Sequence, residues 1–178
     1  MKAAGNAQLE ERALIWAVGR DGALTCDFLT SAGFEALSVQ NCNEICREIE
    51  RGAGVLILAS EVLSYPDSDI LRELLHRQPA WSDIPVIVVA GRSGGGSTLN
   101  HIVGDFNGVS VLHRPLLLDT LISTIGAALR ARRRQYQVRD LLRQRDETDR
   151  RREEFLAMLH MNYATRCLPS ARDCRCCA

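Results

Sequence analysis

Short apolar runs alternate with amphipathic runs through the first two thirds of the chain. An uninterrupted apolar run of this kind is typical of a strand that is buried on both faces. An amphipathic run that stops at Gly is typical of a helix. The pattern predicts helices between five strands, which are expected at residues 13–19, 35–39, 54–58, 84–90 and 109–113.

Strands and helices in alternation are typical of a parallel sheet with right-handed crossovers. The fold class expected is therefore α/β, a flavodoxin-like doubly wound sheet of five parallel strands in the order 2-1-3-4-5. A Gly-rich loop at residues 91–97 and a weak helix at 98–103 are expected before the fifth strand.

Residues 127–159 contain no Gly and no Pro and are rich in Arg, Leu, Glu, Gln and Ala, which are good helix formers. They predict one helix about 50 Å long. A narrow seam steps along it by four and three residues, as in a two-stranded coiled coil, with Arg at three positions. The alternative is a single solvated helix. The predicted dimer contacts on the seam are Val138, Leu141, Thr148, Phe155 and Leu159.

The charge, the apolar content and the cysteines of the chain limit the classes of function that it can have. The 178 residues carry 22 basic and 22 acidic side chains, so no net charge points to nucleic acid or membrane. No apolar run is long enough to span a membrane, and residues 1–12 lack the apolar core of a signal peptide. Cys26, Cys42 and Cys46 are expected to be reduced thiols of a cytoplasmic protein. No metal or cofactor is expected.

Small and charged residues stand where the predicted strands end. In a sheet of this type the chemistry lies at the carboxyl ends of the strands. Two of these residues follow the first strand, two the third, one ends the fourth and two follow the fifth. In chain order they are Arg20, Asp21, Ala59, Ser60, Ala90, Arg114 and Pro115.

The runs PVIVVAG and VLHRP, followed by a helix, resemble the last two strands of response-regulator receiver domains. The resemblance covers roughly residues 12–130. It implies a pair of acids that hold Mg²⁺ after strand 1, a phospho-accepting Asp after strand 3, a Ser or Thr after strand 4 and a Lys after strand 5. A carboxylate nucleophile needs a hard cation to neutralise the incoming phosphoryl oxygens and an ammonium to hold the product.

This chain departs from the receiver pattern at each of those places. Ala59 and Ser60 stand where the Asp is expected, Ala90 has no hydroxyl, and Arg114 keeps the charge without the compact ammonium. Glu61 is offset along the chain and is expected to turn away from the strand axis. The departures predict a pseudo-receiver that does not accept phosphate. The resemblance also implies a cis peptide bond before Pro115.

Two alternatives remain at this point. The first is a phosphorylatable receiver with an atypical site, in which Glu61 or Asp21 binds a metal or Ser60 is modified. The second is a nucleic-acid binder that uses the Arg run at residues 130–134. Ten Arg and six acids lie between residues 130 and 154, a local charge of +4, and Arg on helices contacts phosphates.

The run RREEFLAML resembles the opening of the histidine phosphotransfer domain of sensor histidine kinases. In that family the next residues are commonly Ala-His-Glu-Leu-Arg-Asn-Pro, whereas this chain continues HMNYATR from His160. The codons CAY ATG AAY TAY GCN ACN CGN, preceded by one G, regroup as GCA YAT GAA YTA YGC NAC NCG. With suitable free bases this encodes the kinase sequence. The pattern predicts that one base is missing after the Leu159 codon.

Residues 160–178 are accordingly expected to be an out-of-frame or disordered tail. The alternative is a zinc site made by its four cysteines. Adjacent cysteines fit poorly with the paired C-x₂₋₄-C spacing of tetrahedral zinc sites. The four are Cys167, Cys174, Cys176 and Cys177.

These features predict a non-catalytic signalling and dimerisation module of a bacterial two-component system. Its expected parts are a polar tail (1–11), a receiver-like domain (12–129), a signalling helix that enters the phosphotransfer domain (130–159) and the tail (160–178). The intact parent is expected to be a hybrid-type sensor histidine kinase. Expected partners are a second copy through the C-terminal helix, and the kinase core or a response regulator in the intact protein. A membrane is not expected, and nucleic acid is disfavoured.

Overall fold

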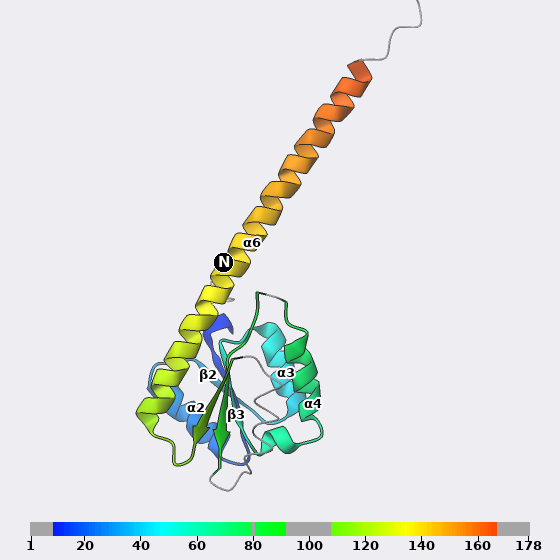
Figure 1. Ribbon diagram of the computed structural model, residues 1–178. Coiled ribbons are helices and arrows are strands. Elements are labelled where there is room, and N and C mark those ends of the chain that lie inside the picture. The colour runs from blue at the N-terminus through cyan, green and yellow to red at the C-terminus, as the bar shows by residue number, and fades with distance from the viewer. Residues whose placement is uncertain (1–8, 80, 92–107, 167–178) are drawn as a thin grey trace, which may run out of the picture. The chain divides into compact units, whose positions relative to one another are not determined.

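The computed structural model describes residues 9–79, 81–91 and 108–166. Its strands form one parallel sheet in the order β2-β1-β3-β4-β5, which confirms the expected topology (Figure 1). The expected Gly-rich loop from residue 92 onward and the weak helix at 98–103 lie outside the described residues. The strands are β1 (Ala13–Trp16), β2 (Ala36–Val39), β3 (Val55–Ala59), β4 (Val86–Ala90) and β5 (Val109–His113).

Two strands are shorter than their apolar runs. β1 ends at Trp16, whose pairing with Val39 is the last in the β1–β2 ladder, and Gly19 then takes a positive φ of 66°. β4 begins at Val86 rather than at residue 84. Pro85 has no N–H to give to the ladder, although its carbonyl accepts a hydrogen bond from the Leu56 amide at 3.0 Å. Hydrophobicity alone predicts neither end.

The helices connect the strands, and β2 and β5 are the two edge strands of the sheet. The start of α3 differs from the expected start at Asn43. Its N-cap is Asn41, whose side chain accepts from the Glu44 amide at 2.9 Å, while the Glu44 carboxylate accepts from the Gln40 amide at 2.7 Å. Asp67 stands at the N-cap of α4 without a side-chain capping bond. The helices are α2 (Asp21–Ser31), α3 (Cys42–Arg51), α4 (Ser68–His76) and α6 (Leu118–Arg166), with a 3₁₀ turn at Val62–Ser64.

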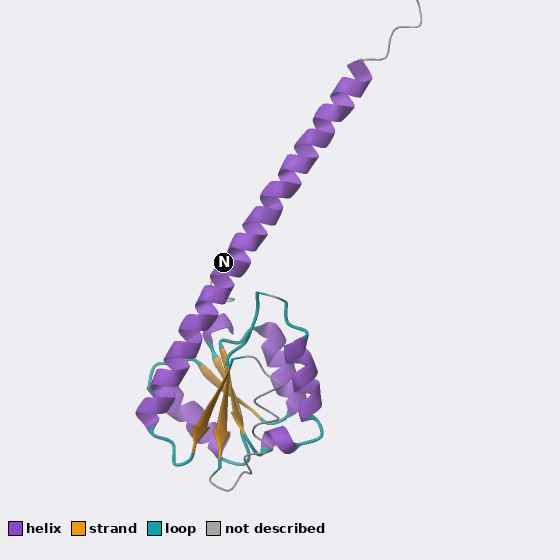
Figure 2. Ribbon diagram, in the orientation of Figure 1, coloured by secondary structure: helices purple, strands orange, loops and turns teal. Residues whose placement is uncertain are grey.

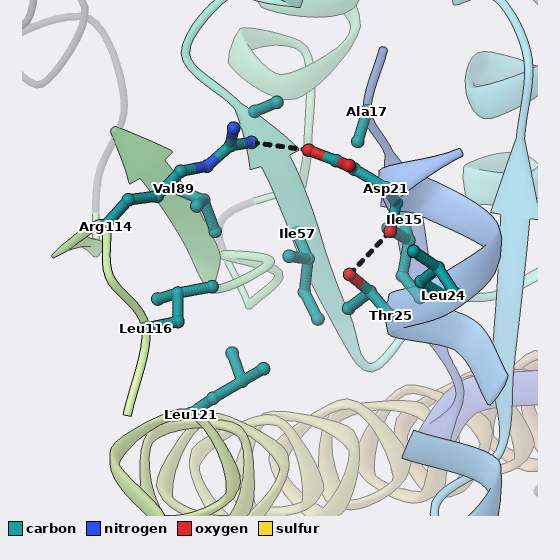
Figure 3. A pocket seen from close by; sticks show the side chains of 11 residues that line it. Ile15, Ala17, Asp21, Leu24, Thr25, Ile57, Val89, Arg114, Leu116 and Leu121 are labelled. Atoms are coloured by element: carbon teal, nitrogen blue, oxygen red, sulfur yellow. Dashed lines mark hydrogen bonds and ion pairs between the residues drawn. The ribbon is translucent and has the colours of Figure 1, made fainter. Parts of the chain in front are cut away.

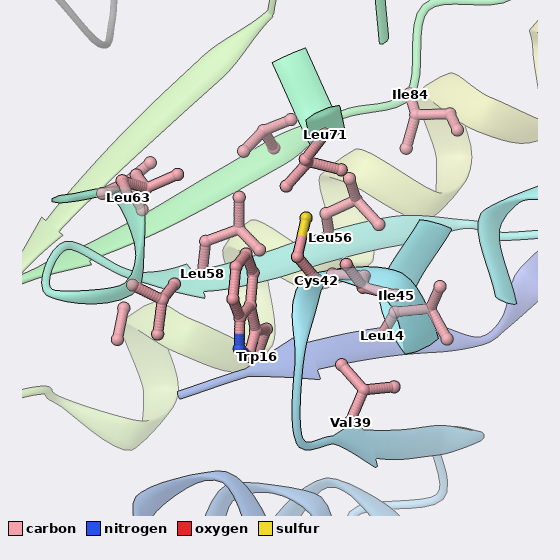
Figure 4. Close-up of a cluster of buried hydrophobic side chains, with 14 of the residues drawn as sticks. Leu14, Trp16, Val39, Cys42, Ile45, Leu56, Leu58, Leu63, Leu71 and Ile84 are labelled. Atoms are coloured by element: carbon pink, nitrogen blue, oxygen red, sulfur yellow. The ribbon is translucent and has the colours of Figure 1, made fainter. Parts of the chain in front are cut away.

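Each central strand buries both faces, because side chains alternate along it. Leu14 and Trp16 face the layer made by α3 and α4, where they join the cluster of Figure 4. Ala13 and Ile15 face the layer made by α2 and the first turns of α6. Figure 2 shows these two helical layers on either side of the sheet. The sheet is therefore a double-sided core, as near-continuous apolar strands require.

Arg132 on α6 is buried, with only 4% of its surface exposed. It donates to the Ala53 carbonyl at 3.2 Å, to the Ser82 hydroxyl at 2.8 Å and to the Gln135 side-chain oxygen at 2.7 Å. Its guanidinium carbon lies 4.5 Å from the centre of the Tyr136 ring. This environment satisfies the charge by hydrogen bonds and by a cation–π contact.

The neighbours of Arg132 complete a cluster that fastens α6 to the loop before β4. The Tyr136 hydroxyl donates to the Ala53 carbonyl at 3.0 Å, and its ring lies 6.1 Å from that of Trp81. The Gln135 side chain donates to the Asp83 carbonyl at 2.8 Å and accepts from the Asp83 amide. We call Trp81, Arg132, Gln135 and Tyr136 the Arg132 cluster.

The Arg run is thus not a free basic surface. Besides the buried Arg132, Arg133 makes a paired contact with the Glu11 carboxylate at 2.6 and 2.7 Å. That contact holds the pKa of Glu11 below its usual value. Two of the four arginines in this run make contacts within the folded domain, which weakens the hypothesis that the run binds nucleic acid.

The chain divides into two compact units, Met1–Val138 and Arg139–Ala178. The first unit reaches beyond the boundary expected at residue 129, since the Arg132 cluster packs on its core. Helix α6 ends at Arg166, seven residues after the expected end at Leu159. The four tail cysteines lie outside the described residues. In the part of the chain that is described, no helix is both long and apolar enough to cross a membrane.

Candidate functional site

The site residues expected from the sequence lie at one edge of the first unit. Parallel strands bring their carboxyl ends to the same edge of a sheet. Ala59 ends β3 and Ala90 ends β4, while Arg114 follows β5 and donates its amide to the Ala90 carbonyl at 2.9 Å. Asp21 begins α2, directly after Arg20 at its N-cap.

An ion-pair group occupies this edge. Arg114 lies 3.1 Å from the Asp21 carboxylate and 3.9 Å from the Glu61 carboxylate (Figure 3 draws the first pair). The three side chains are between 37% and 53% exposed, so solvent screens both contacts. Each is worth about 0–1 kcal/mol to stability. The two contacts therefore add little stability, but they fix the positions of the three side chains, because one guanidinium is shared by two acids.

Glu61 corrects one expectation. It does not turn away from the edge, because the chain leaves β3 at Ala59 and bends into a 3₁₀ turn at Val62. The two-residue alternation of a strand no longer applies there. The Ser60 hydroxyl contacts the Glu61 carboxylate at 3.3 Å, and one Glu61 oxygen lies 3.7 Å from where a β-carbon on Gly91 would be.

The sheet register identifies a residue that the sequence analysis missed. Trp16 pairs with Leu58 across β1 and β3, so the next residue, Ala17, lies beside Ala59. Both alanines line the same pocket. The period-two pattern from Ile15 was the available signal, because Ala17 points to the same face of the strand. Arg20 precedes α2 and lies outside this pocket lining.

The pocket is the concave part of the site. It has a volume of about 200 Å³ and opens beside the Asp21–Arg114 pair (Figure 3). Its walls come from β1, β3, β4, α2 and the first turn of α6. The lining side chains are mainly apolar, and they are Ile15, Ala17, Asp21, Leu24, Thr25, Ile57, Ala59, Val89, Arg114, Leu116 and Leu121.

The site carries little of the phosphorylation chemistry that the receiver resemblance implies. No carboxylate stands at Ala59 or Ser60, and Ala90 is fully buried without a hydroxyl. The peptide bond between Arg114 and Pro115 is cis, as expected. In the part of the chain that the structure describes, no three His, Cys, Asp or Glu side chains group so that they could hold a metal ion. The cation that lies between the acids is the Arg114 guanidinium.

The three internal cysteines are free thiols. Cys42 is buried, and its thiol donates to the Asp67 carbonyl at 2.9 Å. Burial raises the pKa of Cys46 to about 12. A thiol with so high a pKa is protonated at neutral pH and is a weak nucleophile, so neither residue adds chemistry to the site.

The predicted seam residues lie along α6. Leu141 and Phe155 are 65% and 58% exposed in the single chain, and Val138 and Leu159 are also exposed. The Thr148 hydroxyl donates to the Gln144 carbonyl at 2.8 Å, within its own helix. Val138 belongs to the first unit and the other four to the second.

Several solved structures that are similar to this chain are described as receiver domains. NtrX from Brucella abortus, solved with ADP, is 19% identical over 73% of this chain, with a TM-score of 0.57, but the match spans only 28% of that chain. A response regulator receiver domain protein from Clostridium thermocellum is 21% identical, covering 68% of this chain and 96% of that one, with a TM-score of 0.54. The beryllofluoride-activated NtrC4 receiver domain dimer is 17% identical, covering 68% and 98%, with a TM-score of 0.54.

No family model matches the sequence, and no curated protein matches it. The fold and the comparisons agree on the class of fold: the first unit has the fold of receiver domains. At these identities the likeness establishes the fold alone.

Proposed function

We propose that this chain is a signalling module whose receiver-like domain does not accept phosphate. The observation that carries the proposal is the absence of a carboxylate at the end of β3, where Ala59 and Ser60 stand. Phosphoryl transfer to a receiver needs that nucleophile and a hard cation beside it. Without it the domain has no phosphorylation step, and we propose that it acts without catalysis.

Arg114 supports the same proposal by its position. It is shared between Asp21 at 3.1 Å and Glu61 at 3.9 Å. A guanidinium is always charged and presents several donors, so it can pair with two carboxylates at once without a bound metal, and the group of three side chains keeps one net negative charge. The domain thus carries a fixed internal cation in place of an exchangeable one. The charge of this site is therefore fixed, whereas a receiver site that accepts phosphate changes its charge between the unphosphorylated and phosphorylated forms.

The module is proposed to work as a homodimer within a cytoplasmic sensor histidine kinase. Exposed apolar side chains at coiled-coil spacing on α6 support the dimer, because two such seams bury each other. The NtrC4 neighbour is itself described as a dimer. The kinase core or a response regulator is the proposed partner in the intact protein.

The kinase context rests on the run RREEFLAML and on the codon arithmetic after Leu159. DNA sequencing of the encoding gene tests it. We expect that restoring one base after the Leu159 codon opens a frame that reads Ala-His-Glu-Leu-Arg-Asn-Pro and continues into an ATP-binding domain. A gene with no kinase sequence in any downstream frame would contradict this part of the proposal and leave the pseudo-receiver part standing.

A further inference from the structure

The pocket beside Asp21 lies at a special place in the sheet. In the order β2-β1-β3-β4-β5, the connections from β1 and β3 leave toward opposite sides of the sheet. The crevice outside the carboxyl ends of such a strand pair is where open α/β sheets bind their ligands. Ile15 of β1, Ala17 just after β1, and Ile57 and Ala59 of β3 line this pocket.

Small side chains leave space at this edge of the sheet. On the pocket face, Ile15 of β1 is followed by Ala17, just past the end of that strand, and Ile57 of β3 is followed by Ala59. The volume of about 200 Å³ exceeds the roughly 150 Å³ of an engineered apolar cavity that binds benzene. Val89 and Leu121 extend the apolar floor (Figure 3). One aromatic ring with a short chain fits such a space.

The mouth of the pocket offers a hydrogen-bond acceptor. One Asp21 oxygen is paired with Arg114, and the second has no partner among the residues that the structure describes. The Thr25 hydroxyl donates to the Asp21 backbone carbonyl and leaves the carboxylate open. Arg114 already pairs with both Asp21 and Glu61, so its positive charge is less available to a ligand than the negative charge of Asp21. The open group at the mouth is therefore anionic.

We propose that this pocket binds a small organic amine with a single-ring apolar body. The ammonium pairs with the open oxygen of Asp21, and the ring lies against Ile15, Ile57 and Val89. Since Leu24 of α2 and Leu121 of α6 both line the pocket, a bound ligand contacts both helices. Ligand binding then biases the start of α6, which gives a domain without a phosphorylation step an input. Pocket and phosphorylation site are tested separately, so failure of one leaves the other intact.

Binding of three probes to the full chain tests the proposal. The probes are 2-phenylethylamine, the neutral 2-phenylethanol and the anionic phenylacetate, which share one ring and differ in head group. Ligand-observed NMR titration should give saturable binding, with the amine about tenfold tighter than phenylacetate, because the Asp21 carboxylate attracts the ammonium and repels the anion at a partly exposed site. No saturable binding of the amine, or equal binding of amine and anion, would overturn the proposal.

Variants place the binding in the pocket. Ala17→Leu fills the half-buried end of the β1 row, and we expect it to abolish binding of all three probes. Asp21→Asn should leave 2-phenylethanol binding unchanged and reduce the preference for the amine to less than about twofold. Asp27→Asn, on the same helix but outside the pocket lining, is the matched control and should bind as the parent does.

Thermal melting of each variant reports folding. If Ala17→Leu does not fold, the Asp21→Asn comparison still decides the proposal, because it changes charge with little change in shape. An amine preference that survives Asp21→Asn would contradict the assignment.

Discussion

The Arg132→Ala variant is expected to lose about 3 kcal/mol of unfolding free energy. The change removes hydrogen bonds to Ala53, Ser82 and Gln135 and the stacking on Tyr136. A hydrogen bond from a charged group contributes about 1.5–3 kcal/mol and a desolvated cation–π contact about 2 kcal/mol, with partial compensation by the remaining partners. For a chain of this size the loss corresponds to a fall of roughly 10 °C in Tm.

Urea and thermal unfolding followed by circular dichroism measure this effect. Arg134→Ala is the matched control, because Arg134 lies two residues along the same helix and is exposed. It should change stability by no more than about 0.5 kcal/mol. Equal stability of the two variants would mean that the Arg132 cluster does not fasten α6 to the first unit.

The Leu141→Asp, Phe155→Asp double variant is expected to be monomeric, whereas the parent chain is expected to be dimeric. Each side chain is exposed in the single chain and would be covered by a partner helix. Burial of a Leu or Phe side chain contributes about 1.5–3 kcal/mol, and a dimer loses two copies of each. The seam is weakened by Arg145 and Arg152, so it has little reserve. The dissociation constant should rise at least about 1000-fold.

Sedimentation velocity over a concentration series measures the change. The control places acids on the opposite face of the helix, as Arg143→Asp with Ala157→Asp, both at exposed positions. These lie five residues beyond seam positions in the seven-residue repeat and face away from a partner. The control should remain dimeric. A double seam variant that sediments as the parent does would place the dimer contact elsewhere.

The sheet could be predicted from the sequence because its strands are apolar on both faces. Such runs stand out from amphipathic helices, and alternation leaves few topologies. The strand ends could not be predicted in the same way. The end of β1 at Trp16 depends on where its neighbour β2 ends, and the start of β4 depends on a missing N–H at Pro85. Both are properties of pairing rather than of composition.

The Arg run illustrates a second limit. Arg132 and Arg134 are indistinguishable by residue type and are two residues apart, yet one is buried and the other exposed. The difference is set by the direction in which each points from α6, and the partners at Ala53 and Ser82 are distant in sequence. Residue type alone therefore does not separate the buried Arg132 from its exposed neighbours.

The candidate site was predictable as a set of positions but not as a geometry. The expected carboxyl ends of the strands were enough to predict Asp21, Ala59 and Arg114 as site residues. That Arg114 is shared with Glu61 depends on a turn after β3, and that Ala17 lies beside Ala59 depends on register. The pocket also needs α2 and α6 in place, which no local pattern specifies.

Fluorine NMR of the full chain with beryllofluoride and Mg²⁺ tests the central claim most directly. Beryllofluoride forms its adduct on a carboxylate that stands beside a bound cation, and the NtrC4 receiver domain, described as beryllofluoride-activated, is the positive control. The chain has Ala59 and Ser60 at the nucleophile position and Arg114 in place of an exchangeable cation. The account predicts only free beryllofluoride signals. A Mg²⁺-dependent bound signal that disappears in Asp21→Asn or Glu61→Gln would contradict it and identify the carboxylate responsible.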